Sequence, residues 1–422
     1  MKRTLIRMVI GLMLGMLLCA ASASAETGDT MFFMIGENGF INPSNAAAIG
    51  NMGFIMTLDN GRETIYRIRA GEMQPEGFLL EKISDDPMDY GTFLLFGYGE
   101  ELMGLNARSG RVYQIELTNG TAILTERLQL DWKDMDAGYD ESGSVPRELG
   151  KYVVSGDTLY LTVYEEGSWN RMELIAYSLK DGSRRIVSRK DVIFSIHHPG
   201  AFGDLAAYRD GRLLTALPDE KDREAVWRLC EISTEDGSVK EITKLSGVGV
   251  GGLVYDEAQD RVVYLCGGMI CATDLNGNHA ELASSPVGAP NPEQCYGGAA
   301  LLKGGYYFVS RYEGSAVRNI GSAGQLRTLT IAGERAQSDA AFLAFSEAHP
   351  EAAIRYREER LNPEEIIQAM MSASSEIDIY YLNTSNEAFR ALTRRGYAAD
   401  LSQSKTLMGL TERMFPVFQN RI

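Results

Sequence analysis

The segments "TLYLTVY" (residues 158–164) and "MELIAYSLKDG" (residues 172–182) decide the fold, because together they describe a β-hairpin that ends at a glycine turn. Their apolar side chains alternate with polar ones or run together, as in strands that pack on one or both faces. The Asp-Gly pair at the end favours a tight turn, because such turns need positive φ. The predicted unit is a strand, a turn, a second strand, a glycine turn and a third strand.

This unit recurs along the chain. Its glycine turns lie at Gly71, Gly120, Gly182, Gly237, Gly277 and Gly324, with spacings of 49, 62, 55, 40 and 47 residues. A β-propeller has this period, since each blade is a sheet of about four strands in roughly forty to fifty residues. The repeats predict six blades. Residues 31–40, "MFFMIGENGF", form either part of a seventh blade or the strand that closes the ring.

The N-terminus has the pattern of an export signal. Three cations, Lys2, Arg3 and Arg7, precede a short apolar run, and "ASA" precedes Glu26. This pattern predicts a cleaved signal over residues 1–25 and an extracellular or periplasmic protein. A lipoprotein anchor at Cys19 is the alternative, and the large residue before that cysteine disfavours it.

The composition and net charge of the chain limit the classes of function and partner that it can have. The 422 residues are 45% apolar, which predicts a folded chain of more than one domain. The net charge of −16 becomes −19 when the three cations of the signal are removed, which argues against nucleic acid as a partner. The cysteines outside the signal are Cys230, Cys266, Cys271 and Cys295. Their pairing stays open: "CGGMIC" suits either a cross-strand disulfide or buried thiols, and neither a zinc site nor a cofactor is predicted.

The pattern changes after the propeller segment, predicted over residues 26–325. In residues 326–422, the strands "LRTLTIAG", "AAIRYRE" and "IDIYYL" alternate with amphipathic helical segments. The third strand lacks polar alternation, as expected of a parallel strand buried on both faces. This order predicts right-handed crossovers and a parallel sheet.

This ordered set, with "GYAADLS" after it, resembles the start of the extracellular (family 1) solute-binding proteins of ABC importers over about 95 residues. The resemblance implies a partial α/β lobe of periplasmic-binding-protein type. It also implies a small solute, such as a sugar or oligosaccharide, that passes to an ABC permease. The ligand contacts carried over by position are Glu334, Arg335, Asn383, Thr384 and Ser385, with helix caps or polar loop groups as the alternative. The chain ends before the rest of the lobe, so we expect a truncated receptor.

Two functions follow. The first is the exported solute-binding component of an importer, with an incomplete ligand cleft. The alternative is an extracellular propeller that recognises glycan or protein and carries a vestigial lobe. We expect no enzyme, because the acids of residues 131–141 are typical of a solvated loop and no catalytic motif accompanies them.

Overall fold

The computed structural model of the chain describes its β-sheet framework and the turns that connect it. The described residues are 7–8, 30–33, 40–59, 62–70, 75–81, 93–132, 149–165, 168–191, 205–219, 226–246, 250–266, 269–284, 298–311, 314–320, 327–333, 352–357, 368, 377–381, 390 and 394. They divide between two compact units. Unit 2 comprises Gly28–Ala283 and Ala289–Ala323, and unit 1 comprises Met1–Thr27, Ser284–Gly288 and Gly324–Ile422.

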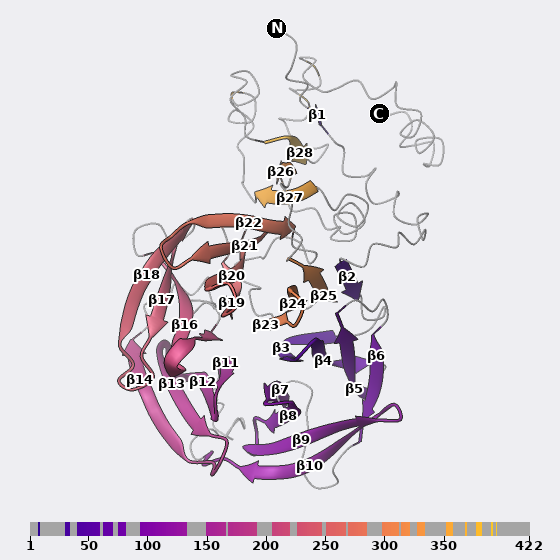
Figure 1. The fold of residues 1–422 in the computed structure, drawn as a ribbon, viewed down its shortest axis with the longest axis vertical. Helices are drawn as coiled ribbons and strands as arrows, with labels where there is room; N and C mark the ends of the chain where they lie inside the picture. The colour runs from indigo at the N-terminus through magenta and orange to yellow at the C-terminus, as the bar shows by residue number, and fades with distance from the viewer. Residues whose placement is uncertain are drawn as a thin grey trace. The chain divides into compact units, whose positions relative to one another are not determined.

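Unit 2 is a β-propeller built from four-stranded antiparallel blades (Figure 1). Blade 1 comprises β3 (Phe40–Ile49), β4 (Met52–Asp59), β5 (Arg62–Arg69) and β6 (Glu76–Leu80). Blade 2 comprises β7 (Phe93–Tyr98), β8 (Glu101–Asn106), β9 (Arg111–Thr118) and β10 (Thr121–Gln129). Blade 3 comprises β11 (Leu149–Ser155), β12 (Thr158–Glu165), β13 (Ser168–Ser178) and β14 (Arg184–Asp191).

The next two blades follow the same order. Blade 4 comprises β15 (Leu205–Ala207), the 3-10 helix η2 (Arg209–Gly211), β16 (Leu213–Pro218), β17 (Val226–Ile232) and β18 (Val239–Ser246). Blade 5 comprises β19 (Gly251–Asp256), β20 (Arg261–Cys266), β21 (Met269–Asp274) and β22 (His279–Ser284). The propeller is therefore confirmed, with the predicted strand pairs in its blades.

Blade 6 combines the two ends of unit 2. Three of its strands are β23 (Ala299–Leu302), β24 (Tyr306–Arg311) and β25 (Gly314–Asn319). The fourth is β2 (Thr30–Phe33), which pairs antiparallel with β25, Met31 lying opposite Val317. Of the two roles predicted for the segment that begins at Met31, the structure gives it the ring-closing one.

The innermost strands form a closed ring. β3 contacts β7, β7 contacts β11, β11 contacts β15, β15 contacts β19, β19 contacts β23, and β23 contacts β3. Figure 1 shows these strands around the centre of the propeller, with the later strands of each blade farther out. Blades 1 and 2 are also joined at their outer strands, because β6 pairs parallel with β10. Six four-stranded groups are thus present among the described residues.

The predicted glycine turns join the third and fourth strands of the blades. Gly120, Gly182, Gly237 and Gly277 all have positive φ, between 69° and 91°. The turns at Gly182 and Gly237 are built alike, from "SLKDGS" and "STEDGS". In each turn the aspartate, Asp181 or Asp236, accepts a hydrogen bond from the backbone N–H of the serine two residues later, at 3.0 Å. The predicted turns at Gly71 and Gly324 lie outside the described residues.

Apolar side chains fill the space between blades. The cluster between blades 2 and 3 includes Leu105, Leu161, Ile175 and Tyr177, all nearly inaccessible to solvent. Trp132 leaves blade 2 and enters the same cluster, where its ring centroid lies 5.2 Å from that of Tyr177. Each blade therefore depends on its neighbours for burial of its faces.

Unit 1 contains a parallel sheet in the order β1-β28-β26-β27. These strands are β1 (Arg7–Met8), β26 (Arg327–Gly333), β27 (Ala352–Arg357) and β28 (Ile379–Tyr381). The parallel pairing predicted for the three C-terminal strands is confirmed. Asp378 adds to the pairing by accepting a hydrogen bond from the backbone N–H of Thr330 at 2.8 Å.

The predicted α/β binding lobe is not supported. The elements defined among the described residues of unit 1 are all strands, and none is α-helical. Two of the predicted helical segments are "NPEEIIQAMMSAS" (residues 362–374) and "SNEAFRALTRRG" (residues 385–396). Only single residues of these segments are described, such as Gln368 and Arg390, and these are helical. Parallel pairing is shared by many α/β folds, so it does not identify a solute-binding lobe. No helix in the described part of the chain is long and apolar enough to cross a membrane.

Removal of β2 tests the closure of the ring. A chain without residues 1–35 lacks the four-residue ladder to β25, and we expect it to lose about 2–4 kcal/mol of unfolding free energy at roughly 1 kcal/mol per hydrogen bond. Thermal and urea unfolding measure this difference. The control lacks only residues 1–25 and keeps β2. Equal stability of the two chains would contradict closure by this strand.

The aspartates of the two Asp-Gly-Ser turns have unusually low pKa values. Hydrogen bonds from Ser183 lower the pKa of Asp181 from 3.8 to about 2, and those from Ser238 and Ser233 lower the pKa of Asp236 likewise. Because both folded pKa values are depressed, the stabilisation is present above pH 3.8 and is lost as the pH falls toward 2.

Carboxyl NMR titration of the Ser183→Ala variant tests the cause. The hydroxyl of Ser183 donates to Asp181 at 2.7 Å, so its removal should raise the pKa of Asp181. The pKa of Asp236 should stay at about 2, which makes the second turn the internal control. Unchanged titration of Asp181 would show that the hydroxyl bond is unimportant.

Candidate functional site in the central channel

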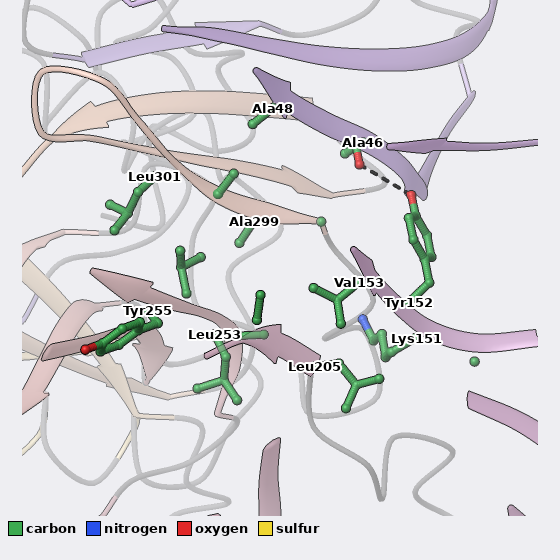
Figure 2. A pocket seen from close by; sticks show the side chains of 16 residues that line it. Ala46, Ala48, Lys151, Tyr152, Val153, Leu205, Leu253, Tyr255, Ala299 and Leu301 are labelled. Carbon is green, nitrogen blue, oxygen red and sulfur yellow. Dashed lines mark hydrogen bonds between the residues drawn. The ribbon is translucent and has the colours of Figure 1, made fainter. Parts of the chain in front are cut away.

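A cavity of about 350 Å³ lies in the central channel of the propeller (Figure 2). Its walls come from β3, β11, β15, β19 and β23, the innermost strands of five blades. Small side chains make up much of the lining, namely Ala46, Ala48, Ala206, Ala207, Ala299 and Ala300. Strands of the ring can approach one another because these side chains are small, and the space left has the size of a small-molecule site.

The channel wall is more polar than its alanines suggest. Each innermost strand stands at the end of its sheet and so pairs on one side only. An edge strand presents backbone N–H and C=O groups along its other side. The lining therefore combines alanines and larger apolar side chains, such as Leu205 and Leu253, with backbone donors and acceptors that can bind the hydroxyl groups of a ligand.

Tyr152 of β11 ties three innermost strands together. Its hydroxyl donates to the carbonyl of Leu95 on β7 at 2.6 Å and lies 3.3 Å from the carbonyl of Ala46 on β3. Figure 2 shows the side chain directed toward Ala46. Burial raises the pKa of Tyr152, so the hydroxyl stays a neutral donor. The single hydroxyl proton of Tyr152 thereby lies between carbonyls of two neighbouring blades.

Lys151 is placed by a β-bulge. On β11, Leu149 faces Val163 and Tyr152 faces Leu161, so β11 holds one residue more than β12 between these pairs. Such a bulge changes the direction of a side chain and is frequent beside functional sites. Figure 2 shows Lys151 among the lining side chains, next to Tyr152.

The bulge is fixed by a buried hydroxyl. Thr162, which is 2% exposed, accepts a hydrogen bond from the backbone N–H of Lys151 at 2.6 Å and donates to its carbonyl at 3.1 Å. A Cβ on Gly150 would lie 2.4 Å from the Thr162 oxygen. Residue 150 must therefore be glycine if the threonine is to hold this position.

A second group of polar side chains adjoins the cavity at Tyr255 of β19. The hydroxyl of Tyr255 donates to Asp260 at 2.6 Å, and this bond raises the pKa of Tyr255 to about 12. Arg209 of blade 4 lies 3.5 Å from the same carboxylate, and the ring of Tyr208 meets that of Tyr255 edge to face at 4.7 Å. The group fixes the Tyr255 ring where blades 4 and 5 meet.

The described cysteines and acids lie apart from one another. No group of three or more potential metal ligands occurs among the described residues. Cys266 lies opposite Met269, and Cys271 lies opposite Tyr264, so these cysteines are offset across their hairpin. Both are buried, as is Cys230. The offset disfavours a disulfide across "CGGMIC", because a direct bridge needs Cβ atoms about 3.5–4.5 Å apart.

The ligand-binding residues predicted by resemblance lie outside the described residues; they are Glu334, Arg335, Asn383, Thr384 and Ser385. Cys295 also lies outside the described residues. Of the acidic segment at residues 131–141, only Asp131 and Trp132 are described. The channel residues escaped prediction because five separate blades supply them. One local signal was present: "GKYVVSG" (residues 150–156) puts a lysine after glycine at the start of an apolar strand.

Comparison with known proteins gives only distant likenesses. No known family profile matches the chain, and no curated protein is similar to it. Puromycin hydrolase is similar at 14% identity and a TM-score of 0.41, over 68% of this chain and 54% of the hydrolase, so the chain spans about half of that protein.

Two other solved structures are similar over larger shares of their own length. BamB from Moraxella catarrhalis is 10% identical with a TM-score of 0.34, over 66% of this chain and 85% of BamB. The PQQ-bound aldose sugar dehydrogenase from Streptomyces coelicolor is 10% identical with a TM-score of 0.40, over 70% of this chain and 99% of the dehydrogenase. At these values the likenesses carry no inference about activity or ligand.

These findings correct the predicted family. The resemblance to solute-binding proteins of ABC importers is wrong, because no family profile matches the chain and no α-helical element of such a lobe is defined among the described residues of 326–422. Strands that alternate with amphipathic segments are common to many α/β proteins. The order of such segments in residues 326–422 indicates parallel pairing and does not identify a receptor.

The Tyr152→Phe variant tests the contact between blades. Loss of the hydroxyl leaves the carbonyls of Leu95 and Ala46 without this donor, and we expect a loss of about 1–3 kcal/mol in unfolding free energy. Tyr306→Phe is the matched control, because the half-buried Tyr306 lies on β24, away from this contact. Equal stability of the two variants in urea unfolding would show that Tyr152 does not join the blades.

Proposed function

We propose that this chain is an exported, non-catalytic recognition module whose propeller binds a saccharide in its central channel. One observation carries the proposal: the cavity of about 350 Å³ is lined by the innermost strands of five blades. This volume lies in the range of roughly 300–1,000 Å³ common for small-molecule sites. It suits a small sugar or the terminal units of a longer glycan.

The chemistry of the wall supports a saccharide. Sugar hydroxyl groups both donate and accept hydrogen bonds, and the free edges of the innermost strands offer N–H and C=O groups in alternation. The ring of Tyr255 adds an apolar surface to the same wall. Small alanine side chains leave parts of the backbone accessible beside the larger apolar side chains of Leu205, Leu253 and Leu301, so the wall offers both hydrogen-bonding groups and apolar surface.

Export supports an encounter with extracellular glycan. Residues 1–25 carry the cation-rich start, apolar run and small-residue end of a cleaved signal. Expression in a secreting host followed by N-terminal sequencing tests this step. We expect the mature protein to begin at Glu26, so that its parallel sheet in unit 1 keeps β28, β26 and β27 and loses β1. A product that retains residues 1–25 in the cytoplasm would contradict export.

A channel-filling variant tests the site. The Ala299→Phe substitution places a ring at a half-buried position in the lining and should abolish binding by occupying the cavity. The control is Ile123→Phe, on the outer strand β10, where the replaced side chain is 37% exposed. Glycan microarrays probed with the full chain measure binding. Thermal unfolding checks that each variant is folded.

The outcomes separate the alternatives. We expect the natural chain and Ile123→Phe to bind the same saccharides and Ala299→Phe to bind none. Binding by all three proteins would place the site outside the channel. Absence of saccharide binding by the natural chain would overturn the proposal and would favour a protein ligand instead.

A further inference from the structure

Two tyrosines of the cavity wall differ in their roles. They are Tyr152 on β11 and Tyr255 on β19, the aromatic side chains among the described residues that line the cavity. The hydroxyl of Tyr152 is directed toward Ala46 and joins neighbouring blades (Figure 2). The hydroxyl of Tyr255 is bound within its own blade, by Asp260, and the half-buried ring lines the cavity. Tyr255 is therefore the aromatic surface of the wall that is suited to a ligand.

A β-bulge in β19 decides the side of the strand from which Tyr255 leaves. Gly251 faces Leu265 and Val254 faces Val263, so β19 holds one residue more than β20 between these pairs. One extra residue reverses the sides on which all later side chains of a strand stand. The side chain of Tyr255 therefore depends on this bulge for its direction.

Blade 6 holds the bulge in place. Gly252 lies within it and has a φ of 64°, a conformation that favours glycine. The carbonyl of Gly252 accepts a hydrogen bond at 2.6 Å from the hydroxyl of Tyr307 on β24, a fully buried residue. A Cβ on Gly252 would lie 2.3 Å from that hydroxyl oxygen. The glycine and Tyr307 together therefore fix the bulge.

Further contacts fix the Tyr255 ring itself. Its hydroxyl donates to Asp260 at 2.6 Å, and the ring of Tyr208 from blade 4 meets it edge to face, with the ring centroids 4.7 Å apart. Arg209 lies 3.5 Å from the same carboxylate, and its guanidinium carbon lies 5.0 Å from the centroid of the Tyr208 ring. A ring that is already held in one position loses little freedom when a ligand binds to it.

We infer that the apolar face of a pyranose stacks on the ring of Tyr255. The inference rests on the proposed function and adds the class of ligand, a pyranoside whose hydroxyl groups are equatorial, as in the gluco form. The face of an aromatic ring is negative, and the C–H groups of a sugar are weakly positive because their carbons also carry oxygen. A sugar face without axial hydroxyls can lie flat on the ring. Backbone groups of the wall then bind the equatorial hydroxyls.

Calorimetry with three methyl β-glycosides and the full chain tests this inference. The gluco form has no axial hydroxyl, the manno epimer has one on one face of its ring, and the allo epimer has one on the opposite face. We expect the gluco form to bind most tightly. One epimer should lose about 10-fold more affinity than the other, because only one face of the sugar stacks on the tyrosine and an axial hydroxyl there prevents contact.

Substitutions at residue 255 identify the ring as the cause. Tyr255→Leu keeps apolar bulk and removes the flat face, so the difference between the two epimers should disappear. Tyr255→Phe keeps the ring and should retain the difference, with weaker binding because Asp260 no longer holds the ring. Tyr306→Leu is the control, because the half-buried Tyr306 on β24 is not part of the lining. It should retain the natural order of affinities.

Saturation-transfer NMR on the natural chain keeps the test decisive if Tyr255→Leu fails to fold. Irradiation of the aromatic protons of the protein should transfer most strongly to the C–H protons of one face of the gluco ring. That face should be the one that carries the axial hydroxyl in the disfavoured epimer. Equal transfer to both faces would contradict stacking.

The results distinguish failure of the inference from failure of the proposed function. Equal affinities of the two epimers, or a difference that persists in Tyr255→Leu, would overturn stacking on this ring. Binding on the glycan array to saccharides other than the gluco form alone would overturn the class of ligand and leave the proposed function intact. Absence of binding by all three glycosides, together with a negative glycan array, would overturn the proposed function itself.

Discussion

The antiparallel pairing of β2 with β25 is the constraint on which the propeller depends. Blades bury their faces against one another, so the first and last blades must meet for the set to be complete. β2 carries the chain from the N-terminal side of unit 2 into the last blade, where Met31 lies opposite Val317. The innermost strands then contact one another in a closed ring. The channel exists only because this ring is closed.

Closure also explains the character of the channel wall. A strand at the centre of the ring has no partner on its inner side, and its backbone groups face the space that remains. The hydroxyl of Tyr152 donates to a carbonyl of β7 and lies 3.3 Å from one of β3. The neighbouring Lys151 is displaced by the bulge and lines the cavity. Two adjacent residues of β11 thus differ in role: Tyr152 joins neighbouring blades, and Lys151 lines the cavity of the proposed binding site.

The blades were predictable from sequence because their turns are local. Gly120, Gly182, Gly237 and Gly277 have the positive φ that their spacing and turn residues predict. β15, by contrast, has only three residues and no alternation that would reveal an innermost strand. The partner of β2 lies more than 280 residues away along the chain, and no local pattern specifies it.

The candidate site was also harder to predict, because no local pattern specifies contacts between segments that are distant in the sequence. Its walls come from five blades, and the place of Lys151 in the lining appears only when β11 is seen beside the channel. The predicted contacts at Asn383 and its neighbours came from a family resemblance that the comparisons contradict. A pattern of strands and helices sets the local structure, whereas a binding site depends on which distant segments meet.

Cysteine cross-linking of the ring tests the account most directly. The pairs Met31→Cys with Val317→Cys, and Phe32→Cys with Ala316→Cys, place thiols at directly opposed positions of β2 and β25. After oxidation, peptide mass spectrometry should find a link between residues 31 and 317 or between residues 32 and 316, and the cross-linked chain should still bind its saccharide. Failure of both pairs to form, or loss of binding in a correctly linked chain, would contradict a closed propeller with its ligand in the central channel.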